Sequence, residues 1–336
     1  MTAVRKKKGA AAETVAPRAF ENGLDQTLRP RSWDEYVGQQ KVKENLRILL
    51  TAARERSQAA EHILLYGPPG LGKTTLAHLI SGTLGTNMRV TSGPAIERVG
   101  DLAAILTNLS PGDILFIDEI HRLSRAVEEV LYPAMESGVL DIILGKGPSA
   151  RTVQLDLPPF TLVAATTRIS LISAPLRSRF SGGTFRLDFY TDEEIAAILA
   201  RSAELLGMAP TPETLATIAS RARATPRTGN YLLKRCRDLA QLENADISDD
   251  VVVRTFALLD IEDRGLHGLD RALLRAIVQK FNGGPVGLNT LAAATGEEMA
   301  TIEDVLEPYL IRQGLIERTP RGRIATASAH EHMQGG

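Results

Sequence analysis

The sequence has only one cysteine, no long apolar run and no excess of charge of one sign. Its single cysteine, Cys236, excludes an internal disulfide bond and fits a reducing cytoplasm. We expect this cysteine to be a buried small residue on a helix and not a zinc ligand. Nowhere do about 18 apolar residues follow one another, and the N-terminal stretch has no apolar core of a signal peptide. A secreted or membrane-spanning protein is therefore not expected.

The overall charge is close to neutral. The 39 lysines and arginines nearly cancel the 40 aspartates and glutamates, so the overall charge indicates neither a nucleic-acid nor a membrane partner. Any basic binding face must be local. With 336 residues, of which 43% are hydrophobic and 24% charged, the chain has an ordinary globular composition and the length for two or three domains.

The residue patterns divide the chain into five segments. Residues 1–20 are rich in Ala, Lys and Arg without periodicity, which favours a disordered tail over a weak DNA-attracting arm. We expect an α/β domain at 21–187, a small helical domain at 188–262 and a winged-helix domain at 263–330. The last residues, 331–336, are expected to be a frayed tail.

The α/β prediction rests on three apolar runs, HILLYG at 62–67, DILFID at 113–118 and FTLVAATT at 160–167. Continuous apolar runs separated by amphipathic stretches are typical of parallel strands covered by helices on both faces. In 124–136, apolar residues recur at helical spacing, which predicts a helix with one buried face. The segment should therefore have a nucleotide-binding type of α/β fold.

The pattern changes to helices after Tyr190, beginning with a capping box of Thr191 and Glu194. Near the C-terminus, three helical stretches precede two short strands around a Pro-Arg-Gly turn, which is the order of a winged helix. We expect these elements at about 270–281, 288–294 and 301–313, then at 315–319 and 323–327.

The stretch GPPGLGKTT at 67–75 matches the phosphate-loop pattern GxxxxGK[ST] and lies between an apolar strand and a helix. In that context the loop N–H groups cradle phosphates, Lys73 reaches the β and γ oxygens and Thr74 ligates Mg²⁺. The sequence therefore predicts an ATP and Mg²⁺ site. The residues expected to bind the nucleotide in this loop are Gly70, Gly72, Lys73, Thr74 and Thr75.

Polar side chains end the two later strands. Asp118 is placed to hold Mg²⁺, and Glu119 to polarise a water for attack on the γ-phosphate, which favours hydrolysis over mere binding. Thr167 is placed to bond the γ-phosphate or the attacking water. The alternatives are that Glu119 is a solvated strand end and that Thr167 is an ordinary strand threonine.

Three arginines are candidates for stabilising charge during hydrolysis. Arg177 and Arg179 follow the third strand at the far end of the domain, where a neighbouring subunit's phosphate is the expected target and Arg179 acts in trans. Arg227, after a proline at a helix start, is expected to touch the phosphates of its own chain. The alternative for each is an ordinary solvated arginine.

Taken together, these motifs resemble the AAA+ ATPases and, more narrowly, the RuvB family of bacterial Holliday-junction branch-migration motors. The resemblance covers roughly residues 22–330. Single phosphate-loop motifs are widely shared, but the string from Asp113 to Glu136 and the C-terminal block are similar to RuvB in particular. The matching stretches are LRPRSWDEYVGQQKVKENL from 28, GPPGLGKTT from 67, ILFIDEIHRLSRAVEEVLYPAME from 114, PPFTLVAATTR from 158, APLRSRF from 174, TPR from 225, GPVGLNTLA from 284, TIEDVLEPYLI from 301 and TPRGR from 319.

The resemblance implies a homohexameric ring on duplex DNA at Holliday junctions, driven by ATP hydrolysis and loaded by the junction-binding partner RuvA. It implies a cytoplasmic role in recombination and repair, with the RuvC resolvase left open as a third partner. By motif match, Thr167 is sensor 1, Arg179 the arginine finger and Arg227 sensor 2.

The resemblance also assigns contacts outside the phosphate site. The span 137–157 resembles the family's protruding β-hairpin, whose exposed apolar pair contacts RuvA; a buried strand is the alternative. That pair corresponds to Val153 and Leu155. The residues that match the adenine-side segment and the nucleotide-contacting tyrosine of the family are Leu28, Arg29 and Tyr190.

The winged-helix segment holds a local excess of positive charge. The run 312–323 contains four arginines against Glu317, a local balance of about +3, which favours sequence-independent phosphate contacts suited to a sliding motor. A solvated hairpin is the alternative. The four residues are Arg312, Arg318, Arg321 and Arg323, of which the last three are the predicted DNA contacts.

Two departures from the family pattern stand out. Met299 occupies a position where relatives usually have a basic residue, and the stretch 181–185 is one residue longer. Gly182 and Gly183 add backbone freedom between finger and lid, and the sequence leaves open whether this alters their coupling. Rival functions are a protein unfoldase, suggested by Tyr36-Val37-Gly38 as a pore-loop grip, a clamp-loader subunit, and an adaptor that binds ATP without turnover.

Overall fold

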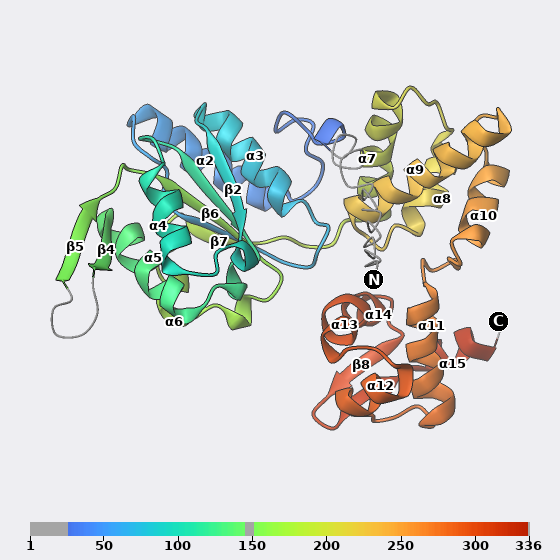
Figure 1. Cartoon of the computed structure of the whole chain (residues 1–336). Coiled ribbons are helices and arrows are strands. Elements are labelled where there is room, and N and C mark those ends of the chain that lie inside the picture. Colours follow the sequence, from blue (N-terminus) through green and yellow to red (C-terminus); the bar gives the residue numbers. More distant parts are fainter. Residues whose placement is uncertain (1–25, 145–150, 335–336) are drawn as a thin grey trace, which may run out of the picture.

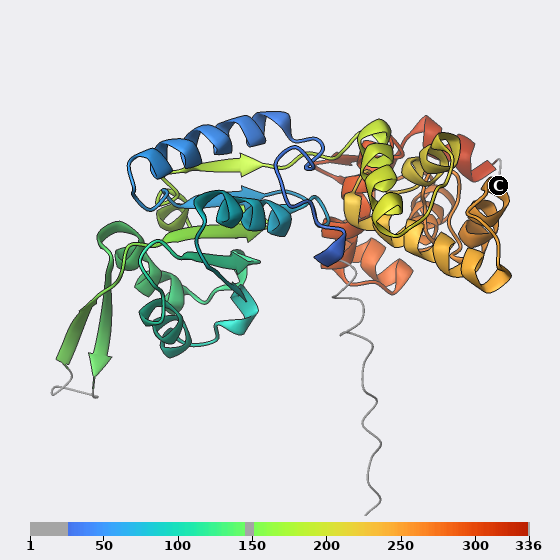
Figure 2. The same cartoon turned by 90° about the horizontal axis from the view of Figure 1, so that it is seen from above.

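The computed structural model describes residues 26–144 and 151–334, so the predicted tail at 1–20 lies outside the described residues. An α/β domain, a helical domain and a winged-helix domain follow one another along the chain (Figure 1). A β-hairpin projects from the end of the α/β domain that is remote from the other two domains (Figures 1 and 2).

The central sheet has five parallel strands in the order β2-β3-β6-β1-β7. The three predicted apolar runs become the inner strands. The sequence does not predict the two edge strands, because part of their side chains is exposed and neither forms a continuous apolar run. The strands are β1 Ile63–Tyr66, β2 Met88–Ser92, β3 Ile114–Asp118, β6 Thr161–Thr166 and β7 Gly183–Arg186.

Alternate side chains of each inner strand enter two different cores. Ile63 and Leu65 of β1 pack with α2 and α3, whereas Leu64 packs with α4 and α5. This division follows from the two-residue period of a strand, and each fully buried leucine contributes roughly 1.5–3 kcal/mol. The helices are α2 Gln40–Glu55, α3 Lys73–Leu84, α4 Val99–Thr107 and α5 Arg125–Ser137, with the short α6 at Ala174–Arg177.

The predicted hairpin at 137–157 is present as an antiparallel pair, β4 Val139–Leu144 with β5 Arg151–Asp156. Val153 and Leu155 lie on β5, and each is 37% exposed. The alternative of a buried strand is therefore wrong. Two apolar side chains face solvent on an element that projects from the domain (Figure 2).

The helical domain begins where the capping box predicts. The Thr191 hydroxyl accepts a bond of 3.2 Å from Glu194 N, and the Glu194 carboxylate accepts one of 2.9 Å from Thr191 N. The core of this domain is continuous with the α2–α3 core, and Tyr190 joins the two. Cys236 is buried on α9, as predicted. The helices are α7 Asp192–Leu205, α8 Pro212–Ser220, α9 Pro226–Glu243 and α10 Asp249–Leu258.

The winged-helix domain has a core of its own and three helical stretches before its hairpin, as predicted. The first stretch is α11 Gly268–Arg275 with a π-helical turn at Ala276–Lys280, and the second is α12 Leu288–Thr295. The third runs from α13 Met299–Thr301 through a π-helical turn at Ile302–Leu306 to α14 Glu307–Arg312. The hairpin pairs β8 Ile316–Thr319 with β9 Gly322–Ala325.

The C-terminal tail differs from the prediction. A helix, α15 Ala327–Gln334, packs on the winged-helix domain through Ala329 and Met333, and the ring of His332 lies 3.0 Å from a carboxylate oxygen of Glu262. The segment is short and its apolar residues are too few to show a period in the sequence. Its contacts with the rest of the domain explain why residues 331–334 are helical instead of frayed.

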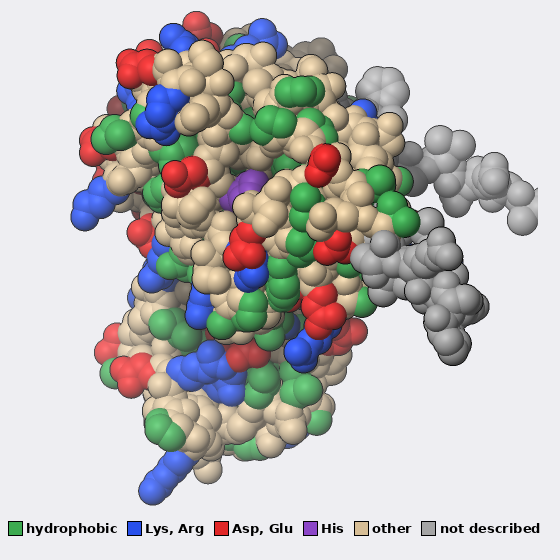
Figure 3. All heavy atoms as spheres, turned by 90° about the vertical axis from the view of Figure 1, so that its left-hand side faces the viewer, with side chains coloured by type: hydrophobic (Ala, Val, Ile, Leu, Met, Phe, Trp, Pro, Cys, Tyr) green, Lys and Arg blue, Asp and Glu red, His purple; other side chains and the backbone are tan. Residues whose placement is uncertain are grey.

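Charges of both signs are interspersed on the face of the molecule that Figure 3 shows, in keeping with the balance in composition. Among the described residues, no helix has the length and apolarity to cross a bilayer. The parallel sheet covered on both faces, the helical lid domain and the C-terminal winged helix confirm the predicted fold class.

Candidate active site

The phosphate loop connects β1 to the first turn of α3, at the carboxyl end of the sheet. Gly70 and Gly72 have φ values of 82° and 94°, which side chains rarely adopt. A Cβ on Gly72 would lie 3.1 Å from the Tyr36 hydroxyl, and one on Gly70 would lie 3.1 Å from Cβ of Arg227. The loop therefore needs glycine at both positions to take its shape and to fit its surroundings.

Lys73 begins α3 and is only 7% exposed. Its Nζ donates to the carbonyls of Gly67 at 2.8 Å and Pro68 at 2.9 Å. Burial lowers the pKa of Lys73 from its usual value, and the negative charges of Asp118 and Glu119 oppose that effect. Thr74 and Thr75 follow in the same first helical turn and are half-buried. The unpaired N–H groups of this turn and the ammonium provide positive potential for an anion.

The strand order brings the predicted acids and threonine to this loop, because β6 lies between β1 and β3. Asp118 ends β3 and accepts a 3.0 Å bond from Glu119 N. Burial raises the pKa of Asp118 above its usual value, an effect that Lys73 partly offsets. Thr167, just beyond β6, donates a 3.1 Å bond to Glu119 Oε2.

The backbone of Glu119 has an unusual conformation. Its φ is 49° and its ψ 46°, in the left-handed region, and its carbonyl lies so close to Gly93 that a Cβ there would approach within 2.4 Å. Strained positions of this kind cost about 1–3 kcal/mol and are concentrated at functional sites. The strand β3 thus ends in a turn that aims the Glu119 carboxylate toward Thr167.

The lid contributes Arg227 to the same place. The amide N of Arg227 lies 3.5 Å from the carbonyl of Gly70, and its charge lowers the pKa of both Lys73 and Asp118. Arg227 is positioned because Thr225 caps the N-terminus of α9. The predicted cis arginine is therefore beside the phosphate loop.

The residues predicted for the adenine side lie next to the loop and the lid. Leu28 is 5% exposed, and its carbonyl accepts a 2.9 Å bond from Arg201 of α7. Arg29 Nη1 lies 2.6 Å from Nε2 of His78 on α3. These contacts place the segment between α3 and the lid. Arg201 was not among the predicted residues, because its only signal in the sequence is its place on an amphipathic helix.

Tyr190 is 1% exposed, and its hydroxyl bonds the Tyr36 hydroxyl at 3.2 Å and the carbonyl of Leu71 at 3.3 Å. Burial raises its pKa to about 12. Tyr36 is equally buried, at 4% exposure, so it cannot be the exposed grip of an unfoldase pore loop. Both tyrosines pack against the phosphate loop, Tyr190 at the carbonyl of Leu71 and Tyr36 beside Gly72.

Arg179 is the predicted site residue that the structure does not bring to this loop. Its guanidinium lies 4.5 Å from the ring centre of Tyr132 and 3.1 Å from a carboxylate oxygen of Glu136, both on α5. A further bond of 2.7 Å joins it to the carbonyl of Pro175. Arg177 is exposed nearby. Arg179 is thus held at a different edge of the domain.

The two glycines after Arg179 lie at the edge of the sheet, beside β1. Gly182 N donates a 2.9 Å bond to the carbonyl of His62, and a Cβ on Gly182 would lie 2.9 Å from the carbonyls of Glu61 and His62. Gly183 has a φ of 116° and begins β7. The glycines allow an edge strand to approach β1 closely.

The wing arginines are mostly paired with acids of the same domain. Arg323 is 8% exposed, and its Nε donates a 2.5 Å bond to Glu307. Arg323 is therefore largely withdrawn from solvent by Glu307, and its predicted contact with a DNA phosphate stays a prediction. Arg318 is half-exposed and pairs with Glu303, whereas Arg321 is exposed at the turn of the hairpin.

The fourth arginine of the run, Arg312, donates a 2.8 Å bond to the carbonyl of Tyr190 and lies over the Phe189 ring. It therefore joins the winged-helix domain to the segment that enters the lid. Met299, the departure noted above, is 47% exposed.

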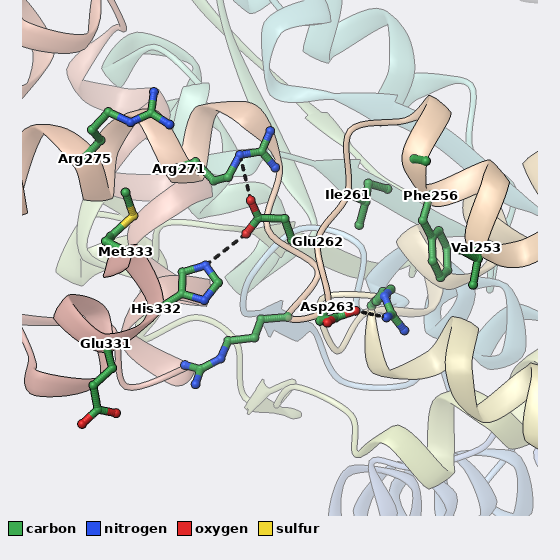
Figure 4. A pocket seen from close by; sticks show the side chains of 13 residues that line it. Val253, Phe256, Ile261, Glu262, Asp263, Arg271, Arg275, Glu331, His332 and Met333 are labelled. Carbon is green, nitrogen blue, oxygen red and sulfur yellow. Dashed lines mark hydrogen bonds and ion pairs between the residues drawn. The ribbon is translucent and has the colours of Figure 1, made fainter. Parts of the chain in front are cut away.

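A cavity of about 730 Å³ lies between α10 of the lid and helices α11 and α15 (Figure 4). Its charged residues are largely paired with one another: Arg221 with Asp263, Arg271 with Glu262, and His332 with Glu262. No residue of the phosphate loop lines this cavity. Within the part of the chain that the structure describes, no group of three or more His, Cys, Asp or Glu forms a metal site.

Three family descriptions match the chain in succession. Residues 28–187 match the Holliday junction DNA helicase RuvB P-loop domain, 190–262 the RuvB AAA lid domain and 263–334 the RuvB C-terminal winged helix domain.

Solved structures of RuvB are also similar to the chain. The Thermotoga maritima RuvB Holliday junction branch migration motor is 49% identical with a TM-score of 0.84, and the match covers 92% of this chain and 99% of that one. A mutant of the Thermotoga maritima protein is likewise 49% identical with a TM-score of 0.84, covering 91% of this chain and 98% of its own. The chain therefore belongs to the RuvB family, and its P-loop domain makes it an ATP hydrolase.

Proposed function

We propose that the protein is an ATP-driven motor that moves Holliday junctions along duplex DNA in the cytoplasm, in recombination and repair. The observation that carries the proposal is the meeting of the phosphate loop, Asp118, Glu119 and Thr167 at adjacent strand ends, in a chain whose three parts all match RuvB domains. We further propose that it acts as a homohexamer with RuvA, and that the resolvase RuvC works on the same junctions.

The residues at the strand ends fit a nucleotide triphosphate with Mg²⁺. Lys73 is a buried cation whose present partners are loop carbonyls, so it can exchange them for phosphate oxygens. Asp118 and Thr74 would hold Mg²⁺ together with phosphate oxygens, which suits an ion that takes few protein ligands. Bound Mg²⁺ supplies neutralisation of the charge that develops on the phosphates.

Glu119 is the proposed base that orients and polarises the attacking water, with Thr167 fixing its carboxylate through the 3.1 Å bond. Arg227 is proposed to stabilise the phosphates of its own chain from the lid.

Arg179 is proposed to complete a neighbouring subunit's site. This proposal is supported by its position on the α5 edge, held by Tyr132 and Glu136 away from its own phosphate loop. An arginine supplied in trans stabilises the charge of the transition state and makes hydrolysis depend on assembly. A hexameric ring then hydrolyses ATP only where two subunits are in contact.

For the partners, we propose that Val153 and Leu155 contact RuvA, since both are apolar and partly exposed on the projecting hairpin. We propose that the winged helix contacts DNA backbone phosphates, with Arg321 as the contact that has no acid partner among the described residues and Arg318 as a second contact that must leave Glu303. Such contacts are salt-dependent and independent of sequence.

The decisive experiment is junction branch migration by the purified protein with ATP, with and without RuvA, using Glu119→Gln as the control. We expect migration that RuvA enhances, and a Glu119→Gln protein that binds ATP but leaves it intact. ATP turnover without junction movement would favour a protein remodeller or clamp-loader subunit, and ATP binding without turnover a nucleotide-gated adaptor. Normal turnover in Glu119→Gln would contradict the role of that residue.

The trans role of Arg179 has its own test. Mixing inactive Arg179→Ala with inactive Lys73→Ala subunits should restore some turnover, because a ring then contains interfaces with one intact phosphate loop and one intact finger. Mixed rings that form and remain inactive would refute it.

A further inference from the structure

The sheet end that carries Glu119 is joined to the winged-helix domain by an ion pair. Arg168, the residue after Thr167, pairs through Nη2 with Asp304 in the π-helical turn of the third helical stretch. The two side chains are 31% and 33% exposed, so the pair is only partly screened by water. In Figure 1 this stretch, α13 to α14, lies on the side of its domain that faces the sheet.

Polar contacts continue from Arg168 to the catalytic carboxylate. Arg168 N donates a 2.9 Å bond to Oγ1 of the fully buried Thr166, and the same oxygen lies 2.9 Å from Nδ1 of His121. His121 Nδ1 lies 3.2 Å from Glu119 Oε2. This series of contacts therefore connects Asp304 of the winged-helix domain with Glu119 of the α/β domain.

Two of these groups meet at one oxygen. Oε2 of Glu119 receives the Thr167 hydroxyl at 3.1 Å and lies 3.2 Å from His121 Nδ1. A carboxylate accepts hydrogen bonds only, so the histidine contact is favourable when Nδ1 carries the hydrogen. The Thr167 bond fixes the carboxylate, whereas the additional His121 contact at the same oxygen makes it a weaker base for water and leaves the carboxylate less free to turn toward a phosphate.

The winged-helix stretch has a second attachment near the nucleotide. Arg312, at the end of α14, donates to the carbonyl of Tyr190, whose hydroxyl supports the phosphate loop at Leu71. Asp304 and Arg312 belong to one continuous helical stretch. A displacement of that stretch therefore acts on Arg168 and on Tyr190 at the same time.

We propose that His121 is a positioning residue that restrains Glu119, and that the Arg168–Asp304 pair makes this restraint depend on the position of the winged-helix domain. Force on the winged-helix domain while it is bound to DNA would then weaken the Arg168–Asp304 pair and loosen the contact between His121 and Glu119. The Glu119 carboxylate would then be free to polarise the attacking water. This inference rests on the proposed function, since it assigns a control to the hydrolysis at that same site.

The test compares ATP turnover with and without saturating duplex DNA in His121→Ala, Asp304→Asn and the charge swap Arg168→Asp with Asp304→Arg. We expect His121→Ala and Asp304→Asn to raise the DNA-free kcat about 3–10-fold with an unchanged KM for ATP, so that stimulation by DNA shrinks. Because both act on one series, the double variant should not exceed His121→Ala alone. The charge swap should restore low DNA-free turnover and stimulation.

The matched control is Glu331→Gln, which removes an exposed acid of the same domain on α15, outside the stretch that carries Asp304; its stimulation ratio should be that of the parent protein. The inference is overturned if His121→Ala and Asp304→Asn keep the parent ratio, if their effects multiply, or if only KM changes. Failure of the charge swap to restore stimulation would also overturn it. If instead the parent protein shows no turnover, it is the proposed function that fails.

Discussion

Removal of Glu307 is the change for which the structure predicts the largest effect in the winged-helix domain. Glu307 and Arg323 are 1% and 8% exposed, and their ion pair joins α14 to the wing strand β9. Glu307→Ala would leave a guanidinium buried without its partner. Removing one partner of a buried pair costs about 3–5 kcal/mol, a large part of the 5–15 kcal/mol of a typical domain.

The matched control is Glu303→Ala, which removes the partner of the half-exposed Arg318. Surface pairs of this kind contribute about 0–1 kcal/mol, so the two variants should differ by several kcal/mol. Replacing the buried pair with Glu307→Leu and Arg323→Met should recover most of the loss, because apolar residues of similar volume remove both buried charges.

The assay is hydrogen exchange measured by mass spectrometry on peptides of residues 263–334, with phosphate-loop peptides as an internal reference. Protection of the winged-helix core should fall by about 3–5 kcal/mol in Glu307→Ala and remain unchanged at the loop. A loss no greater than that of the Glu303→Ala control would refute the reasoning. Arg323 would then have to be reconsidered as a free phosphate contact.

Other outcomes follow from the exposed and buried groups described above. Arg321→Ala should reduce the slope of log affinity for duplex DNA against log salt by about 0.9, and an unchanged slope would exclude the phosphate contact. Serine at both Val153 and Leu155 should weaken RuvA binding at least tenfold while ATP turnover without RuvA stays the same, and undiminished binding would count against the hairpin. Burial raises the pKa of Cys236 from 9.0 to about 11, so the unfolded chain loses this proton first. The contribution of the Cys236 thiol to the free energy of unfolding is therefore complete below pH 9 and falls by roughly 2–3 kcal/mol toward pH 11. Urea titrations across that range should show this loss in the parent protein and not in Cys236→Ala.

The sequence predicted the elements whose signals are local. The phosphate loop could be found because glycine, lysine and threonine occur at fixed spacing between a strand and a helix. The inner strands and the capping box at Thr191 were likewise predicted, since an apolar run and a cap extend over a few consecutive residues. The edge strands and α15 escaped because their short segments show no complete pattern.

Part of the candidate active site could also be predicted from the sequence, because the carboxyl ends of parallel strands lie at one edge of a sheet. Asp118, Glu119 and Thr167 could be grouped from that rule alone, and their roles remain predictions for the experiments above. His121 lies in the family-like stretch that begins at Ile114, but nothing in its neighbours along the chain indicates that it lies 3.2 Å from the Glu119 carboxylate.

The sequence by itself determined the order of the three domains, the phosphate loop and the place of the acids at the strand ends, because these depend on residues close together in the chain. Only the tertiary structure decided which charges are free. Arg323 is neutralised by an acid 16 residues away, Arg168 by one 136 residues away, and Arg179 is held on an edge by α5. The physical reason is that an ionic side chain's role depends on its partner and its burial, and both are fixed by packing between segments that the chain alone leaves unpaired.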